Sequence, residues 1–131
     1  MNQYHQAIDC FKKVLSIDGD DPMALCYLGE SHEQLKEYDI AEHYYHLCLS
    51  LDPKVSEAWL GLGIISDIKG NTVEAIKLIQ KALEYDSENA SNHLVLANAY
   101  HKCELRSEAE EHYLKSIELD PEDAECLQDF V

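Results

Sequence analysis

Apolar residues recur along this chain at the spacing of one helical face, in segments separated by turn-forming residues. From residue 40 to residue 51 they follow positions i, i+3, i+4 and i+7 of a helix, and a shorter stripe of leucines runs from residue 24 to residue 35. Such stripes predict amphipathic helices of roughly 12–15 residues, each about 20 Å long. Because one pair of such helices cannot bury its own apolar face, we expect several pairs to pack against one another.

Glycine and proline mark the ends of the predicted helices. Gly70 suits the left-handed turn that ends one helix, and Thr72 suits the N-cap of the next. Pro53 and Pro121 each follow an aspartate that closes an apolar segment. Because proline disfavours a helical conformation in the residue before it, these positions predict where the second helix of a pair ends.

The helical pattern repeats itself with a period of 34 residues and without insertions. The period is set by four alanines: Ala7, Ala41, Ala75 and Ala109. Each is followed four residues later by a large apolar or aromatic side chain, namely Phe11, Tyr45, Ile79 and Tyr113. Upstream, a second motif keeps the same step: Leu25-x-x-Leu28-Gly29, Trp59-x-x-Leu62-Gly63 and His93-x-x-Leu96-Ala97. A fixed period of this size indicates stacked structural repeats.

These motifs resemble the tetratricopeptide repeat family, whose pattern is Trp-x-x-Leu-Gly-x-x-Tyr, then Ala-x-x-x-Phe, then Pro. The resemblance covers the whole chain, although the Trp of the pattern is present only as Trp59 and its Tyr only as Tyr100. It implies an all-α fold, a right-handed superhelical solenoid of antiparallel helix pairs in a single domain. In this register, residues 1–21 are the second helix of a partial repeat, 22–55, 56–89 and 90–123 are full repeats, and 124–131 start a further or capping helix.

Both ends of the chain fall inside a repeat. Solenoids usually finish with a polar capping helix, but Cys126, Leu127 and Phe130 are apolar. We therefore expect a fragment of a longer array, the alternative being a short protein whose last helix caps the stack with one face. In either case, exposed apolar end helices would favour association with copies of the same chain.

The charge balance narrows the class of partner. The 26 acidic and 10 basic side chains give a net charge of −16. Such a surface repels phosphate backbones, so binding of nucleic acid through a basic groove is excluded, and it attracts basic partners. Individual carboxylates on exposed helix faces need no function beyond solubility.

The remaining composition favours a cytoplasmic protein. No stretch approaches the ~20 apolar residues of a membrane span, and the N-terminus lacks the regions of a signal peptide. The five cysteines are an odd number without a Cys-x-x-Cys motif. They are expected to be small buried side chains in a reducing compartment.

The family resemblance also implies where a partner would bind. In tetratricopeptide proteins the first helix of each pair lines a concave groove that holds an extended or helical peptide. The corresponding positions here are Cys26, Glu30 and Glu33 in the first full repeat, Leu60, Ile64 and Asp67 in the second, and Leu94, Asn98, His101 and Lys102 in the third. They combine an apolar centre with acids toward the N-terminal side, so we expect a partner with apolar anchors and Lys or Arg residues. The alternative is that the apolar members only pack between helices.

One family ligand is excluded by the sequence. Some members grip the C-terminal carboxylate of heat-shock chaperones with Lys, Asn and Arg side chains of the first helices. The positions that would need them hold Cys26, Glu30, Gly61, Ser91 and Val95. None carries a positive charge and Glu30 would repel the ligand, so we do not expect binding of chaperone tails.

Catalytic and cofactor chemistry find no support in the sequence. Among the seven histidines, His43 and His46 have a spacing compatible with one helical face, but we expect them to face solvent on the convex side, and a zinc site would need further ligands. There is no Gly-rich phosphate loop and no nucleophile elbow. We therefore expect no enzyme and no cofactor. The predicted function is a protein–protein interaction scaffold or adaptor; the alternative is a structural module that self-assembles through its terminal helices.

Overall fold

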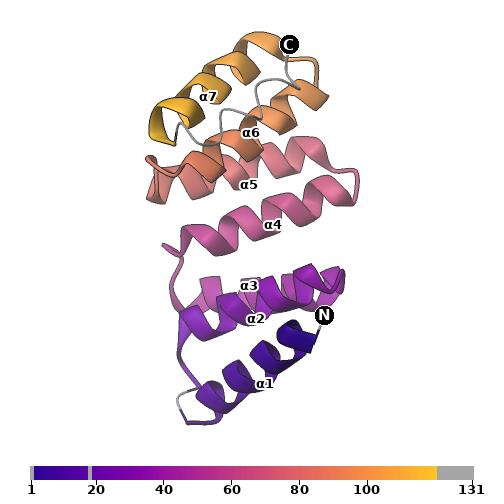
Figure 1. The fold of residues 1–131 in the computed structure, drawn as a ribbon, viewed down its shortest axis with the longest axis vertical. Helices are drawn as coiled ribbons and strands as arrows, with labels where there is room; N and C mark the ends of the chain where they lie inside the picture. Colours follow the sequence, from indigo (N-terminus) through magenta and orange to yellow (C-terminus); the bar gives the residue numbers. More distant parts are fainter. Residues whose placement is uncertain (1, 18, 121–131) are drawn as a thin grey trace.

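A computed structural model describes residues 2–17 and 19–120 of the chain. Across these residues it contains helices and turns (Figure 1). The helices are α1 (Asn2–Ile17), α2 (Pro22–Gln34), α3 (Tyr38–Leu51), α4 (Ser56–Ile68), α5 (Thr72–Tyr85), α6 (Ala90–Lys102) and α7 (Arg106–Leu119). Their lengths agree with the helices predicted from the apolar stripes. The helix expected to start at residues 124–131, and with it Cys126, Leu127 and Phe130, lies outside the described residues.

The helices form an inner and an outer layer. Each helix packs against the next along the chain, and α2, α4 and α6 also contact one another in succession. Within the described residues, the second helices α3, α5 and α7 make no such contacts with each other. The stack is therefore tighter on the side of α2, α4 and α6, which makes this side the concave face of the array (Figure 1).

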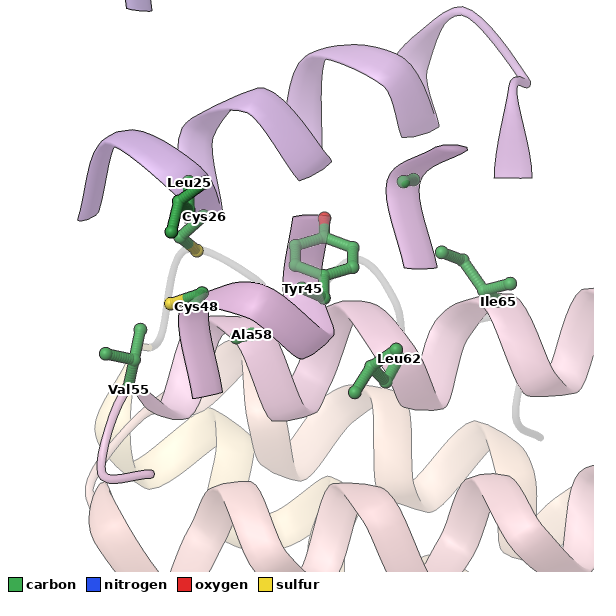
Figure 2. Close-up of a cluster of buried hydrophobic side chains, with 9 residues drawn as sticks. Leu25, Cys26, Tyr45, Cys48, Val55, Ala58, Leu62 and Ile65 are labelled. Atoms are coloured by element: carbon green, nitrogen blue, oxygen red, sulfur yellow. The ribbon is translucent and has the colours of Figure 1, made fainter. Parts of the chain in front are cut away.

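The core is divided among successive helix interfaces, as expected for stacked repeats. Its largest cluster lies between α2, α3 and α4 and is centred on Tyr45, whose side chain is fully buried (Figure 2). Smaller clusters join α4, α5 and α6 around Ile79, and α6 and α7 around Tyr113. These three side chains occupy the same position of the repeat. The tryptophan of the motif, Trp59, is only half-buried, and its indole Nε1 donates a hydrogen bond to the Pro53 carbonyl.

The small residues of the motif allow the helices of a pair to approach closely. A Cβ atom placed on Gly29 would lie 2.7 Å from Cε1 of Tyr45, and one on Gly63 would lie 2.7 Å from Cγ1 of Ile79. Both distances are below van der Waals contact, so these positions cannot carry a side chain without a shift of the packed helices.

The turn inside each helix pair adopts a left-handed residue at the same position of the repeat. Gly70 has a φ of 90°, as the sequence predicted, but Lys36 and Glu104 also have positive φ values, of 63° and 62°. The N-cap of α5 is Asn71, one residue before the predicted Thr72. Because the hydrogen bonds of the turn close around this position, the backbone is held left-handed whichever residue occupies it.

Lys36→Gly is expected to stabilise the protein by about 1 kcal/mol, because a left-handed residue with a Cβ costs roughly 1–2 kcal/mol and glycine avoids most of it. Lys77→Gly, in the exposed middle of α5, is the matched control and is expected to lose about 1 kcal/mol. Urea denaturation of both variants measures the difference. Equal losses for the two would show that Lys36 is not strained.

Candidate functional site: the inner groove

Two hollows on the concave face share one residue. The first has a volume of about 660 Å³ and is lined mainly by α1, α2 and α4, with Tyr45 of α3. The second has a volume of about 450 Å³ and is lined mainly by α4 and α6, with Ile79 of α5. Ile64 of α4 borders both. We call the two hollows together the inner groove, since they follow each other along the inner layer.

Tyr45 of α3 reaches from the core to the wall of the first hollow. Its ring passes between α2 and α4 (Figure 2). A Cβ atom placed on Gly29 would lie 2.7 Å from Cε1 of the ring, and one placed on Gly61 would lie 2.6 Å from Cε2. The phenol oxygen then donates a 2.7 Å hydrogen bond to Oε1 of Glu33 on the groove side. A residue of the outer layer thus fixes an acid of the concave face, which is possible because both inner helices carry glycine at the crossing.

All charged side chains that line the first hollow are acidic. They are Glu30 and Glu33 of α2 and Glu57 of α4. Burial, together with the charges of Glu33 and Glu57, raises the pKa of Glu30 above its ordinary value. Burial also raises the pKa of Glu33, although the hydrogen bond from Tyr45 works against this. The carboxylates therefore repel one another in a partly desolvated space.

The rest of the first hollow is apolar and aromatic. Leu60 and Ile64 come from α4, while Tyr4, Phe11 and Tyr27 come from α1 and α2. The rings of Phe11 and Tyr27 lie with their centroids 5.2 Å apart. The surface thus offers both an apolar floor and ring faces beside the acids.

The second hollow differs because its acid is neutralised. Asp67 of α4 pairs with Lys102 of α6, with 2.5 Å between Oδ2 and Nζ, and also accepts a 2.9 Å hydrogen bond from the Thr72 hydroxyl. Asn98 accepts a hydrogen bond from the hydroxyl of Tyr113, the repeat equivalent of Tyr45. Of the two hollows, the first is therefore the one whose acids form no ion pair within the described residues.

The predicted groove residues separate into two groups. Eight of them line the two hollows: Glu30, Glu33, Leu60, Ile64, Asp67, Asn98, His101 and Lys102. The prediction for Cys26 is wrong, because its side chain is fully buried and its sulfur faces that of Cys48 across the α2–α3 interface (Figure 2). The interaction with the neighbouring Cys48 thiol, and after it burial, raises the pKa of the Cys26 thiol. Leu94 is half-buried and packs against the α6–α7 cluster of Ala97, Ala109 and Tyr113.

Tyr45 and the aromatic residues of α1 and α2 also line the first hollow, although the sequence did not predict them there. A signal for Tyr45 was present in Gly61, a glycine additional to Gly63 of the motif. For Tyr4, Phe11 and Tyr27 no pattern distinguished exposed ring faces from ordinary helix packing.

The histidines assemble no metal centre in the described part of the chain. His43 and His46 are exposed on α3, as predicted. His93 and His112 approach each other with 2.9 Å between their Nδ1 atoms, and Nε2 of His93 lies 2.8 Å from the Ser87 carbonyl. No group of three His, Cys, Asp or Glu side chains among the described residues is placed to hold a metal ion.

Comparison with known protein families tests the resemblance that the repeated motifs indicated. Tetratricopeptide repeat patterns match residues 1–21, 22–55 and 68–128. The chain belongs to the tetratricopeptide repeat family. The predicted fold class, a right-handed superhelical solenoid of antiparallel helix pairs, is confirmed, and this architecture is that of a protein-interaction scaffold.

This tetratricopeptide array is similar to parts of larger proteins. It is 22% identical over 118 residues to anaphase-promoting complex subunit 3 of Schizosaccharomyces pombe, covering 90% of this chain and 18% of that protein. It is 26% identical over 122 residues to the BBSome complex member BBS4 of Bos taurus, covering 92% and 23%. The chain thus spans about a fifth of the length of these relatives.

Among solved structures, the array resembles YrrB, described as a tetratricopeptide protein with an unusual peptide-binding site. The TM-score is 0.81 at 24% identity, over 88% of this chain and 59% of YrrB. In the described part of the array, no helix is both long and apolar enough to cross a membrane.

Proposed function

We infer that this tetratricopeptide array binds a segment of another protein in its inner groove and carries out no catalysis. The observation that carries the proposal is that the two hollows both border Ile64, so that they lie in succession along the inner helices and not as one isolated pocket. Apolar side chains at its centre suit one or more anchors of an extended or helical peptide. Buried thiols at Cys26 and Cys48 suit a reducing, cytoplasmic setting.

The relatives support this proposal by their place in assemblies. Two of them are, by name, members of multi-subunit complexes, and YrrB is described by its peptide-binding site. For the present chain, binding to a partner protein is the shared property that we carry over. The eight groove-lining residues named above are the proposed contact surface.

Ile64→Lys is expected to abolish peptide binding, because it places a charge where the two hollows meet. The probe is a set of peptides selected on the wild-type protein from a random phage-displayed library, with affinities then measured by fluorescence anisotropy. Val73→Lys on the outer helix α5, where Val73 is 66% exposed, is the matched control. Circular dichroism and melting temperature establish that both variants are folded.

The control should retain wild-type affinity for the selected peptides. If folded Ile64→Lys binds them as tightly as Val73→Lys does, the inner groove is not the binding surface. The competing hypothesis, self-assembly through terminal helices, predicts an oligomer by light scattering at high protein concentration. A monomeric wild-type protein would exclude it.

A further inference from the structure

We propose that the first hollow of the inner groove is a seat for an arginine side chain of the partner, with an adjacent apolar residue of the same segment on Leu60 and Ile64. This inference rests on the proposed function and adds the chemistry of the ligand. The groove is then expected to bind a segment that contains a basic residue, and not any apolar peptide.

The charges of the first hollow complement a cationic side chain. The three charged residues that line the hollow, Glu30, Glu33 and Glu57, are all acidic. Within the described residues, no ion pair involves these three glutamates, and four lysines pair with acids elsewhere: Lys69 with Asp39 and Glu42, Lys81 with Glu84, Lys102 with Asp67 and Lys115 with Glu118. The carboxylates of the hollow thus lack an internal cation, whereas the equivalent acid of the second hollow has one.

The shape and composition of the hollow favour arginine over lysine. Its two acidic walls belong to different helices, α2 and α4, and a planar guanidinium with five donors can bond to carboxylates on both sides. The ring faces of Tyr27 and Phe11 line the same space, and guanidinium groups stack on such faces. A volume of about 660 Å³ leaves room for the neighbouring apolar residue.

Holding the acids in place costs the protein stability while the hollow is empty. Burial and mutual repulsion raise the pKa of Glu30, so the folded state binds its proton more tightly than the unfolded state does. The free energy of unfolding therefore falls as the pH rises from about 4.5 through the folded pKa. A residue that destabilises the free protein, and that a bound cation stabilises, is typical of a binding site.

Glu30→Gln is accordingly expected to raise the melting temperature at pH 7. The gain should vanish below about pH 4, where the carboxyl is protonated in both states. A purely structural glutamate would give the opposite result, a lower melting temperature at pH 7. Glu33 is left intact in these variants because it accepts the Tyr45 hydrogen bond.

The binding test compares the wild type with Glu30→Gln/Glu57→Gln in the same random-library selection. A matched control, Glu74→Gln/Glu110→Gln, removes two exposed acids from the outer helices. We expect the wild type and the control to enrich arginine next to an apolar residue, and the groove variant to lose the arginine preference. Replacing that arginine by citrulline in a synthetic peptide should weaken wild-type binding about tenfold and leave binding to the groove variant unchanged.

The outcomes separate this inference from the proposed function. Peptides that depend on Ile64 but show no basic preference, or whose arginine preference persists in Glu30→Gln/Glu57→Gln, would overturn the arginine seat and leave the groove in place. A lysine preference equal to that for arginine would overturn it as well. Absence of any peptide whose binding depends on Ile64 would overturn both.

Discussion

Tyr45→Ala is expected to lower the free energy of unfolding by about 3–5 kcal/mol, the range for removing a large buried aromatic side chain. Tyr45 is fully buried and contacts α2, its own helix α3 and α4 at once. Its loss leaves a cavity at the junction of two repeats, which the rigid helices cannot close. In a solenoid this loss also weakens the coupling between neighbouring repeats.

Urea denaturation followed by far-ultraviolet circular dichroism measures this loss. Tyr85→Ala is the control, because Tyr85 has 38% of its area exposed and is expected to cost much less. Tyr45→Phe keeps the packing and removes only the hydrogen bond to Glu33, so we expect a loss of about 1 kcal/mol. A Tyr45→Ala variant as stable as Tyr85→Ala would contradict the central place of Tyr45 in the core.

Gly61→Val is expected to cost about 1–3 kcal/mol, the usual range for overpacking a core. Even the first carbon of the new side chain would lie 2.6 Å from Cε2 of Tyr45. Helix propensity does not offset this, since valine and glycine are both poor helix formers. The variant should also displace the Tyr45 hydroxyl from its hydrogen bond to Glu33.

A double-mutant cycle identifies the cause of this effect. In a Tyr45→Leu background, Gly61→Val should lower the free energy of unfolding much less, because the aromatic ring with which the valine would clash is absent. Gly19→Val is the control, since the nearest atom to a Cβ there is the Leu15 carbonyl oxygen at 3.6 Å. Additive losses in the cycle would mean that Gly61 is required for a reason other than Tyr45.

Much of the groove was predictable because the repeat register assigns each position a layer. The positions of Ile64 and Glu30 on first helices were sufficient to place them on the concave face. The same rule failed for Cys26, which lies beside the groove positions in sequence but turns toward Cys48. One helical residue corresponds to about 100° of rotation, so a small error in the assumed face moves a side chain from the groove to the core.

The helices, their pairing and the solenoid follow from the repeat pattern alone, because a 34-residue period of small and apolar residues leaves few other ways to bury them. Which acids are neutralised depends instead on how the repeats pack. Asp67 meets Lys102 across α4 and α6, whereas Glu30 and Glu57 meet no cation among the described residues. Such pairings depend on contacts between residues distant in sequence, which have no local pattern. The chemistry of the groove therefore follows from how the repeats stack, while the existence of the groove follows from the repeat itself.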